Sequence, residues 1–156
     1  MPMPTWFIPH GAGPCFFMEW NPEGAWHAMA HFLRGIAQTL PEKPKAVVMV
    51  SAHWLSSNIR VTGATRPDLI YDYSGFPSHT YALKYPAVGD PQLARRILQQ
   101  LETAQISAAI DPTRGFDHGM FIPLMLIFPE ADTPVVQVSL NQNLDPKAHY
   151  QLGEAM

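Results

Sequence analysis

The feature that most constrains the fold is the segment 47–54, which reads V-V-M-V-S-A-H-W. Its leading apolar run, rich in valine, predicts a strand that is buried on both faces. The run gives way to Ser51 and then to His53. A polar side chain at the carboxyl end of a buried parallel strand lies where open α/β sheets bind their ligands. We therefore interpret His53 as a candidate site residue on a buried parallel strand.

The rest of the chain alternates between helix and strand patterns. Apolar residues at helical spacing predict a helix over 25–40. Asp-Pro pairs at 90–91 and 145–146 predict two more, because aspartate is a favoured N-cap and proline fits the first helical turn. An apolar run at 121–128 predicts a short buried helix. Further strands are predicted at 5–9, 59–62, 106–110 and 134–140. This alternation predicts an α/β fold with a mostly parallel sheet flanked by helices, in a single domain.

The length of 156 residues fits one such domain but not two. The last predicted helix runs to the final residue, and residues 154–156 contain no C-cap and no glycine or proline stop. We therefore expect 1–156 to be the N-terminal part of one catalytic α/β domain, truncated at its C-terminus. A sheet cut in this way leaves an apolar edge, so we expect a homo-oligomer or association through that edge.

Charge and composition exclude several classes of partner. The chain has 10 basic and 13 acidic residues, a net charge of −3 with no lysine or arginine run, so we expect no nucleic acid and no anionic membrane as a partner. No apolar run approaches the ~20 residues of a membrane span. The single cysteine, Cys15, excludes an internal disulfide, and its apolar neighbours predict an inert thiol. We accordingly expect the protein in the reducing cytoplasm.

Three of the seven histidines share a context that suggests metal binding: His10, His53 and His118. Each lies at a predicted strand end or a glycine-flanked turn. The segment between His10 and His53 fits a strand–helix–strand unit, which would bring both side chains to one rim of a parallel sheet. Imidazole is the commonest metal ligand, but a mononuclear site usually needs a third ligand, such as a carboxylate.

The other polar candidates have ordinary explanations. We expect Asp72, Asp111 and Asp117 to be solvated, capping or turn-forming carboxylates. The other histidines comprise a surface pair, an exposed residue of the last helix, and a loop residue that could touch a ligand: His27 and His31, His149, and His79. Residues 71–81, Y-D-Y-S-G-F-P-S-H-T-Y, predict an ordered aromatic wall or lid, because long loops in compact domains are usually functional or disordered and the tyrosines argue against disorder.

Several motifs, taken together and in this order, resemble the class III extradiol ring-cleavage dioxygenases of the DOPA-dioxygenase type, which are related to the catalytic subunit of protocatechuate 4,5-dioxygenase. The resemblance covers essentially the whole chain. The motifs are H-G-A-G-P-C-F-F-M (10–18), V-M-V-S-A-H-W (48–54), Y-D-Y-S-G-F-P (71–77), Y-P-A-V-G-D-P (85–91), G-F-D-H-G (115–119) and P-V-V-Q-V-S-L (134–140).

The resemblance implies a non-heme iron(II) enzyme that opens the ring of a catechol-type substrate with O₂. His10 and His53 would be metal ligands, and zinc would be an alternative occupant of the same site. His118 would be the catalytic residue in the substrate pocket, bonding a catechol hydroxyl or bound oxygen. Tyr73 and Phe76 would border that pocket. The implied partners are therefore a small aromatic diol and O₂.

Members of this family usually continue beyond the part matched here, and that continuation carries the third metal ligand and an acid–base histidine. The resemblance therefore implies that 1–156 alone has little or no activity. Two alternatives remain open at the level of the sequence. One is a zinc-binding hydrolase-like or non-catalytic metal-binding relative, and the other is a plain α/β module whose histidines are structural.

Overall fold

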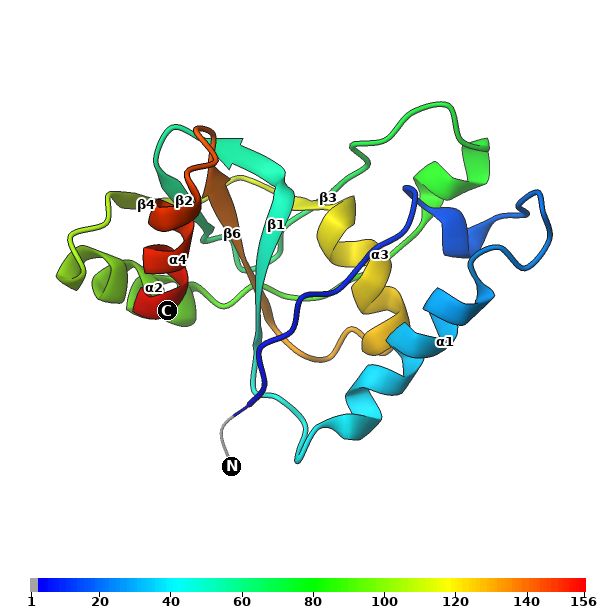
Figure 1. Ribbon diagram of the computed structural model, residues 1–156, viewed down its shortest axis with the longest axis horizontal. Coiled ribbons are helices and arrows are strands. Elements are labelled where there is room, and N and C mark those ends of the chain that lie inside the picture. The colour runs from blue at the N-terminus through cyan, green and yellow to red at the C-terminus, as the bar shows by residue number, and fades with distance from the viewer. Residues whose placement is uncertain (1–2) are drawn as a thin grey trace.

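Helices lie on both sides of a sheet in the computed structural model, which describes residues 3–156 (Figure 1). The strands are β1 (Val47–Ser56), β2 (Ile59–Thr62), β3 (Leu69–Ile70), β4 (Ala108–Asp111), β5 (Phe116–Asp117) and β6 (Val135–Asn141). The helices are α1 (His27–Ile36), α2 (Pro91–Thr103), α3 (His118–Ile127) and α4 (Pro146–Ala155). Short 3₁₀ turns are η1 (Cys15–Phe17), η2 (Ala37–Thr39) and η3 (Ser78–Ala82).

The main sheet has four strands in the order β1-β6-β2-β4, and β3 pairs with β5 in a separate two-stranded sheet. β1 runs parallel to β6, β2 to β4, and β3 to β5. β2 and β6 are antiparallel and meet at the pair Val61–Val138. The predicted class, α/β with a mostly parallel sheet flanked by helices, is thus confirmed.

Strand β6 separates two hydrophobic clusters. Val135 belongs to the cluster packed around α1 and α3, whereas Val136 and Val138 belong to the cluster beneath α2 and α4. Residues 135–139 are all buried, as expected for a strand covered by helices on both faces. In Figure 1, α2 and α4 accordingly lie on one side of β6 and α1 and α3 on the other.

Strand β1 is the outer strand of the main sheet, so the prediction that it is buried on both faces is wrong. Met49 packs against the α1–α3 cluster, but Val48 and Val50 are 43% and 41% exposed. An apolar run favours a strand, but it does not say whether a second layer covers the strand's other face.

The other predicted elements are present, with one exception. Residues 5–9, predicted as a strand, pair with no strand in the described part of the chain, and Pro9 cannot donate to a ladder. Both expected aspartate caps form: Asp90 accepts hydrogen bonds from the backbone N–H groups of Gln92 and Leu93 at 3.0 and 2.9 Å, and Asp145 caps α4. None of the helices within residues 3–156 is long and apolar enough to cross a membrane.

Candidate metal centre

Three imidazoles that are far apart in the sequence converge at one place. His10, His53 and His118 each offer a nitrogen, and these nitrogens all lie within 4.8 Å of one another. The Nε2 atoms of His10 and His53 are 2.9 Å apart, and the ring centroids of His53 and His118 are 4.1 Å apart. The histidines that the sequence singled out therefore form one cluster.

His53 owes its position to an irregularity in β1. Residues Val47–Ser51 pair in step with Val135–Ser139, but the next pair along is Leu55 with Leu140. The residues between Ser51 and Leu55, including His53, therefore leave the ladder. Such bulges re-aim side chains and are common beside functional sites. His53 thus lies in a bulge, not at the strand end that the sequence suggested.

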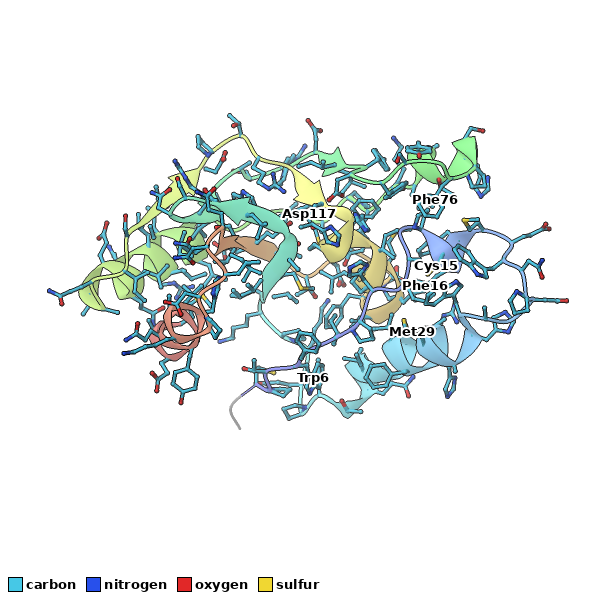
Figure 2. The ribbon with its side chains drawn as sticks, turned by 45° about the horizontal axis from the view of Figure 1, so that its top comes forward. Trp6, Cys15, Phe16, Met29, Phe76 and Asp117 are labelled. Atoms are coloured by element: carbon cyan, nitrogen blue, oxygen red, sulfur yellow. The ribbon has the colours of Figure 1, made fainter. Side chains whose placement is uncertain are left out.

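His10 lies in an irregular turn and not at the end of a strand, which corrects the expected pair of adjacent strand ends. Gly11 and Gly13 that follow it have positive φ angles of 76° and 51°. A Cβ atom on Gly11 would come within 2.5 Å of Cys15 Sγ, and one on Gly13 within 2.8 Å of the Phe76 ring. Glycine therefore lets this turn pack between η1 and the aromatic loop. Figure 2 labels Cys15 in η1 and Phe76 in the aromatic loop.

A buried polar network supports the floor of the cluster. Asp117 is fully buried, so the expectation that it is a solvated carboxylate is wrong. Ser51 Oγ donates to Asp117 Oδ1 at 2.8 Å and accepts from the backbone N–H of His53 at 3.2 Å. Gln137 Nε2 also donates to Asp117, and Arg114 Nη2 lies 3.3 Å from Asp117 Oδ2. A buried carboxyl group needs such partners, and here they tie the His53 backbone to α3.

Asp72 joins two of the three histidines, a contact that the sequence reading missed. Its Oδ1 accepts the backbone N–H of His118 at 2.9 Å and lies 2.7 Å from His118 Nδ1, while its Oδ2 lies 3.6 Å from His53 Nδ1. Burial opposes its ionisation, but the hydrogen bonds from the backbone and side chain of His118 outweigh burial and lower the pKa of Asp72. Asp72 is therefore an ionised carboxylate of the site and not a solvated surface group.

The electrostatics of the cluster suit a cation. Burial lowers the pKa of His10, and positive charge on His118 or His53 would lower it further. His10 Nδ1 is also buried without a hydrogen-bond partner among residues 3–156. Neutral, converging imidazoles are the form that binds divalent metals such as Fe(II) and Zn(II). The residues present therefore fit a metal, because the three clustered imidazoles each offer it a ligand nitrogen.

The aromatic loop reaches the cluster through Tyr73. The Tyr73 ring centroid lies 5.3 Å from that of His118, and Phe76 packs edge-on against Tyr73 at 5.5 Å. Tyr73 Oη donates to the Thr80 carbonyl at 2.7 Å, and burial raises the pKa of Tyr73 to about 12. Tyr73 therefore presents a neutral, fixed ring beside His118, with Phe76 behind it.

The remaining polar candidates are not part of the histidine cluster. His79 Nε2 lies 3.0 Å from the Phe17 carbonyl, so it bonds backbone. Asp111 forms the turn expected of it, accepting from the backbone N–H groups of Thr113 and Arg114. His149, expected to be exposed, is half-buried against the end of β6.

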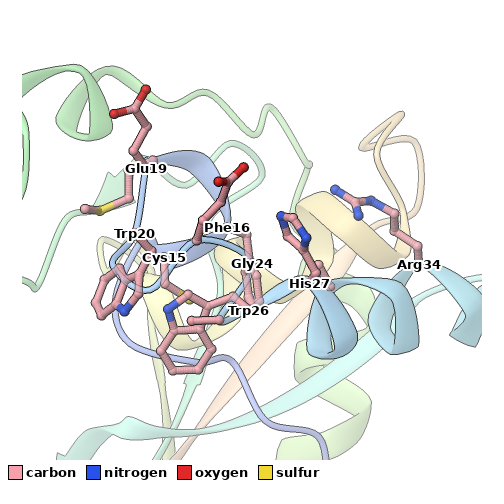
Figure 3. A pocket seen from close by; sticks show the side chains of 12 residues that line it. Cys15, Phe16, Glu19, Trp20, Gly24, Trp26, His27 and Arg34 are labelled. Carbon is pink, nitrogen blue, oxygen red and sulfur yellow. The ribbon is translucent and has the colours of Figure 1, made fainter.

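A cavity of about 660 Å³ lies between η1 and the start of α1 (Figure 3). Its described lining includes Cys15, Trp26, His27 and Arg34 but none of the three clustered histidines. Cys15 is buried there, and burial raises the pKa of its thiol, in agreement with the inert cysteine that we predicted. We assign the chemistry to the histidine cluster because that is where the donor atoms meet.

The family model and the curated relatives that match this chain are described as dioxygenases. The family model described as "Catalytic LigB subunit of aromatic ring-opening dioxygenase" matches residues 4–156. The curated protein dioxygenase tasH of Hapsidospora irregularis is 38% identical over 98% of this chain and 48% of its own length. The 4,5-DOPA dioxygenase extradiol of Beta vulgaris is 40% identical over 97% of this chain and 55% of its own length. The chain thus spans about half the length of these curated relatives.

A solved structure shares the fold. The crystal structure of an uncharacterized protein from Escherichia coli K12 superposes with a TM-score of 0.60 at 33% sequence identity. The alignment covers 87% of this chain and 47% of that one. The 4,5-DOPA dioxygenase extradiol of the same organism is 36% identical over 99% of this chain and 54% of its own length.

Proposed function

Because this chain belongs to the family of the catalytic LigB subunit of aromatic ring-opening dioxygenase, we propose that it forms the metal- and substrate-binding part of an extradiol dioxygenase. The proposed enzyme depends on non-heme iron(II) and cleaves a catechol-type ring with O₂. The observation that carries the proposal is the convergence of His10, His53 and His118. Relatives named 4,5-DOPA dioxygenase extradiol support a catechol-type substrate.

Each residue then has a chemical role. His10 and His53 would hold the metal, and iron(II) bound there would supply the redox chemistry that joins a catechol to O₂. His118 bonds a substrate hydroxyl and exchanges a proton with it, as an imidazole can near neutral pH. Tyr73 and Phe76 wall the pocket with flat apolar surface that suits a phenolic ring. Zinc can occupy the same imidazole site without supporting redox chemistry.

The complete active site needs more than these residues. We propose that the third metal ligand and a further acid–base histidine lie outside residues 1–156, because the chain spans about half the length of the curated relatives it matches. We accordingly propose that residues 1–156 bind metal but turn over little substrate alone. The proposed setting is the cytoplasm, with a small aromatic diol and O₂ as partners, no nucleic acid or membrane partner, and association through the outer edge of β1.

The test uses anaerobic loading with iron(II) of the complete natural protein that contains this sequence, followed by a catechol and air. Ring cleavage should give a yellow semialdehyde product and consume about one O₂ per ring. His10→Ala and His53→Ala should each abolish metal retention and product together, whereas His31→Ala, on the exposed face of α1, should change neither. Absence of product from protein with confirmed iron would refute the proposal.

A zinc hydrolase built on the same three imidazoles is the second candidate, since three-histidine sets also hold catalytic zinc. That chemistry usually needs a carboxylate free to activate water. Asp72, the carboxylate that contacts the cluster, is already engaged by His118 and His53. This arrangement favours the dioxygenase, and oxygen uptake measured beside esterase activity distinguishes the two.

A further inference from the structure

Asp72 occupies a junction between three parts of the fold. It lies in the aromatic loop just after β3, yet its carboxylate contacts the first residue of α3 and the bulge of β1. One oxygen bonds both the backbone N–H and the Nδ1 of His118, and the other faces Nδ1 of His53 at 3.6 Å. No other residue in the described chain contacts both of these imidazoles through a carboxylate.

We propose that Asp72 is the positioning residue that sets the orientation and tautomer of both His53 and His118. This inference rests on the proposed function, because it concerns how that site is held ready for metal and substrate. When its Nδ1–H is directed at the Asp72 carboxylate, each imidazole points its Nε2 lone pair away from Asp72. The Nε2 of His53 lies 2.9 Å from the Nε2 of His10, on the side where the metal ligands meet.

The physical basis is the carboxylate–histidine–metal arrangement. A carboxylate on one ring nitrogen fixes the tautomer, restricts ring rotation and makes the other nitrogen a stronger donor to a metal. The separation of 3.6 Å at His53 is longer than a hydrogen bond, so in this state the contact is electrostatic. A cation on His53 Nε2 would make Nδ1–H more acidic and would strengthen its attraction to Asp72.

His118 gains a different property from the same carboxylate. Its Nδ1 is 2.7 Å from Asp72 Oδ1, so the proton lies on Nδ1 and Nε2 is left as an acceptor. An acceptor is what a residue needs in order to take a proton from a catechol hydroxyl. Asp72 therefore links ligand geometry at His53 to proton transfer at His118.

The alternative is that Asp72 has a purely structural role. Asp117, at the N-cap position of α3, makes no side-chain capping bond, and Asp72 caps the helix instead through the His118 N–H. If capping were its whole function, Asp72→Asn would be nearly silent, because asparagine caps as well as aspartate. The proposal instead requires the charge, which the Asn variant removes while keeping the shape.

The experiment compares Asp72→Asn with Asp68→Asn, a control in the same segment whose side chain is exposed. Cobalt(II) or zinc(II) affinity is measured by chelator competition, and the His118 tautomer is read from ¹⁵N chemical shifts of the metal-free chain. We expect Asp72→Asn to weaken metal binding by ~10–100-fold, the usual effect of losing such a partner. We also expect a loss of the Nδ1–H preference of His118, with Asp68→Asn matching wild type.

The outcomes separate this inference from the proposed function. Wild-type affinity and an unchanged His118 tautomer in a folded Asp72→Asn chain would overturn the positioning role, even if the complete protein cleaves catechols. A protein that cleaves no catechol but shows both effects would retain the positioning role and lose the proposed activity. If Asp72→Asn does not fold, the wild-type spectrum decides: His118 protonated on Nε2 overturns the inference, and on Nδ1 supports it.

Discussion

Gly119 shows how much depends on one missing side chain. A Cβ atom there would come within 2.6 Å of His53 Cδ2 and 3.0 Å of Ser51 Oγ, distances that real contacts avoid. The absence of that atom lets the N-terminal turn of α3 lie against the bulge of β1. Glycine at position 119 therefore lets His53 and His118 share one focus without a shift of the His53 ring.

Gly119→Ala should accordingly displace the His53 ring and weaken zinc(II) binding by ~10–100-fold, like the loss of a supporting partner. The control is Gly153→Ala in α4, where a Cβ would meet no described atom within 4 Å. That control should bind metal normally and gain up to ~1 kcal/mol of stability, since alanine favours helix over glycine. Equal metal affinity for both variants would contradict the packing argument.

Asp111 should make the stability of the chain sensitive to acid. Burial opposes its ionisation, but backbone hydrogen bonds from Thr113 and Arg114 outweigh burial and lower the pKa of Asp111. A lowered folded-state pKa means that the ionised carboxylate stabilises the fold above the unfolded value of about 3.9, and that this contribution is lost as pH falls through the folded value.

Asp111→Ala should therefore lower the free energy of unfolding by ~1 kcal/mol at pH 7, the usual worth of such a hydrogen-bonded turn. The difference from wild type should stay constant down to about pH 5 and shrink at lower pH, because wild type then loses the same interaction. Urea titrations at several pH values measure it. A difference that is the same at pH 7 and pH 3 would show that the charge of the carboxylate is irrelevant.

Single residues also show what the sequence could and could not reveal. His10, His53 and His118 could be singled out because each lies at a predicted strand end or a glycine-flanked turn, where an imidazole has few structural uses. Asp72 could not, because its partners lie across the fold: His118 is 46 positions away, and an aspartate in a polar loop ordinarily faces water. Contacts of this kind depend on how elements dock, which no local pattern encodes.

At the level of elements, the sequence predicted the long strands and the helices, but not how each of them is packed. The hydrophobic run of β1 predicted a strand, and the Asp-Pro pairs predicted the starts of α2 and α4, because these signals act locally. The bulge after Ser51 and the outer position of β1 depend on pairing with β6, nearly ninety positions later in the chain. The bulge sets the direction of the His53 side chain. The sequence therefore did not predict the feature that determines the geometry of the site.

In helix α4, the side chain of His149 makes two hydrogen bonds, which we call the His149 clamp. His149 Nε2 accepts the backbone N–H of Asn141 at 3.0 Å, which leaves Nδ1 protonated and 2.7 Å from the Asp145 carbonyl. His149→Ala removes both bonds and should cost ~1–2 kcal/mol of stability. Hydrogen exchange at the Asn141 amide should accelerate, whereas His31→Ala on α1 should leave that amide unchanged. Protection that persists in His149→Ala would exclude the clamp.

At the scale of the whole molecule, the fold class followed from the alternation of strands and helices, whereas the limits of the sheet did not. The described sheet ends at β1, and apolar side chains on that strand remain exposed. They are Val48, Val50 and Leu55. An outer strand with unpaired backbone groups and apolar neighbours is a template for further pairing.

We predict that isolated residues 1–156 pair through β1 with a second copy of themselves, because β1 combines a free edge with the exposed Val48 and Val50. Replacing both valines with lysine should shift the chain toward monomer in sedimentation velocity, since edge lysines resist strand pairing. Zinc affinity should be retained, because both positions precede the bulge that holds His53.

The matched control replaces Tyr150 on α4, a residue that is 69% exposed, with lysine. This variant adds positive charge without touching β1, so it should associate as wild type does. If charge alone dispersed the chain, the β1 double variant and the Tyr150 variant would both become more monomeric. If wild type were already monomeric at ~100 μM, a concentration at which contacts of even modest affinity are populated, pairing through β1 would be excluded.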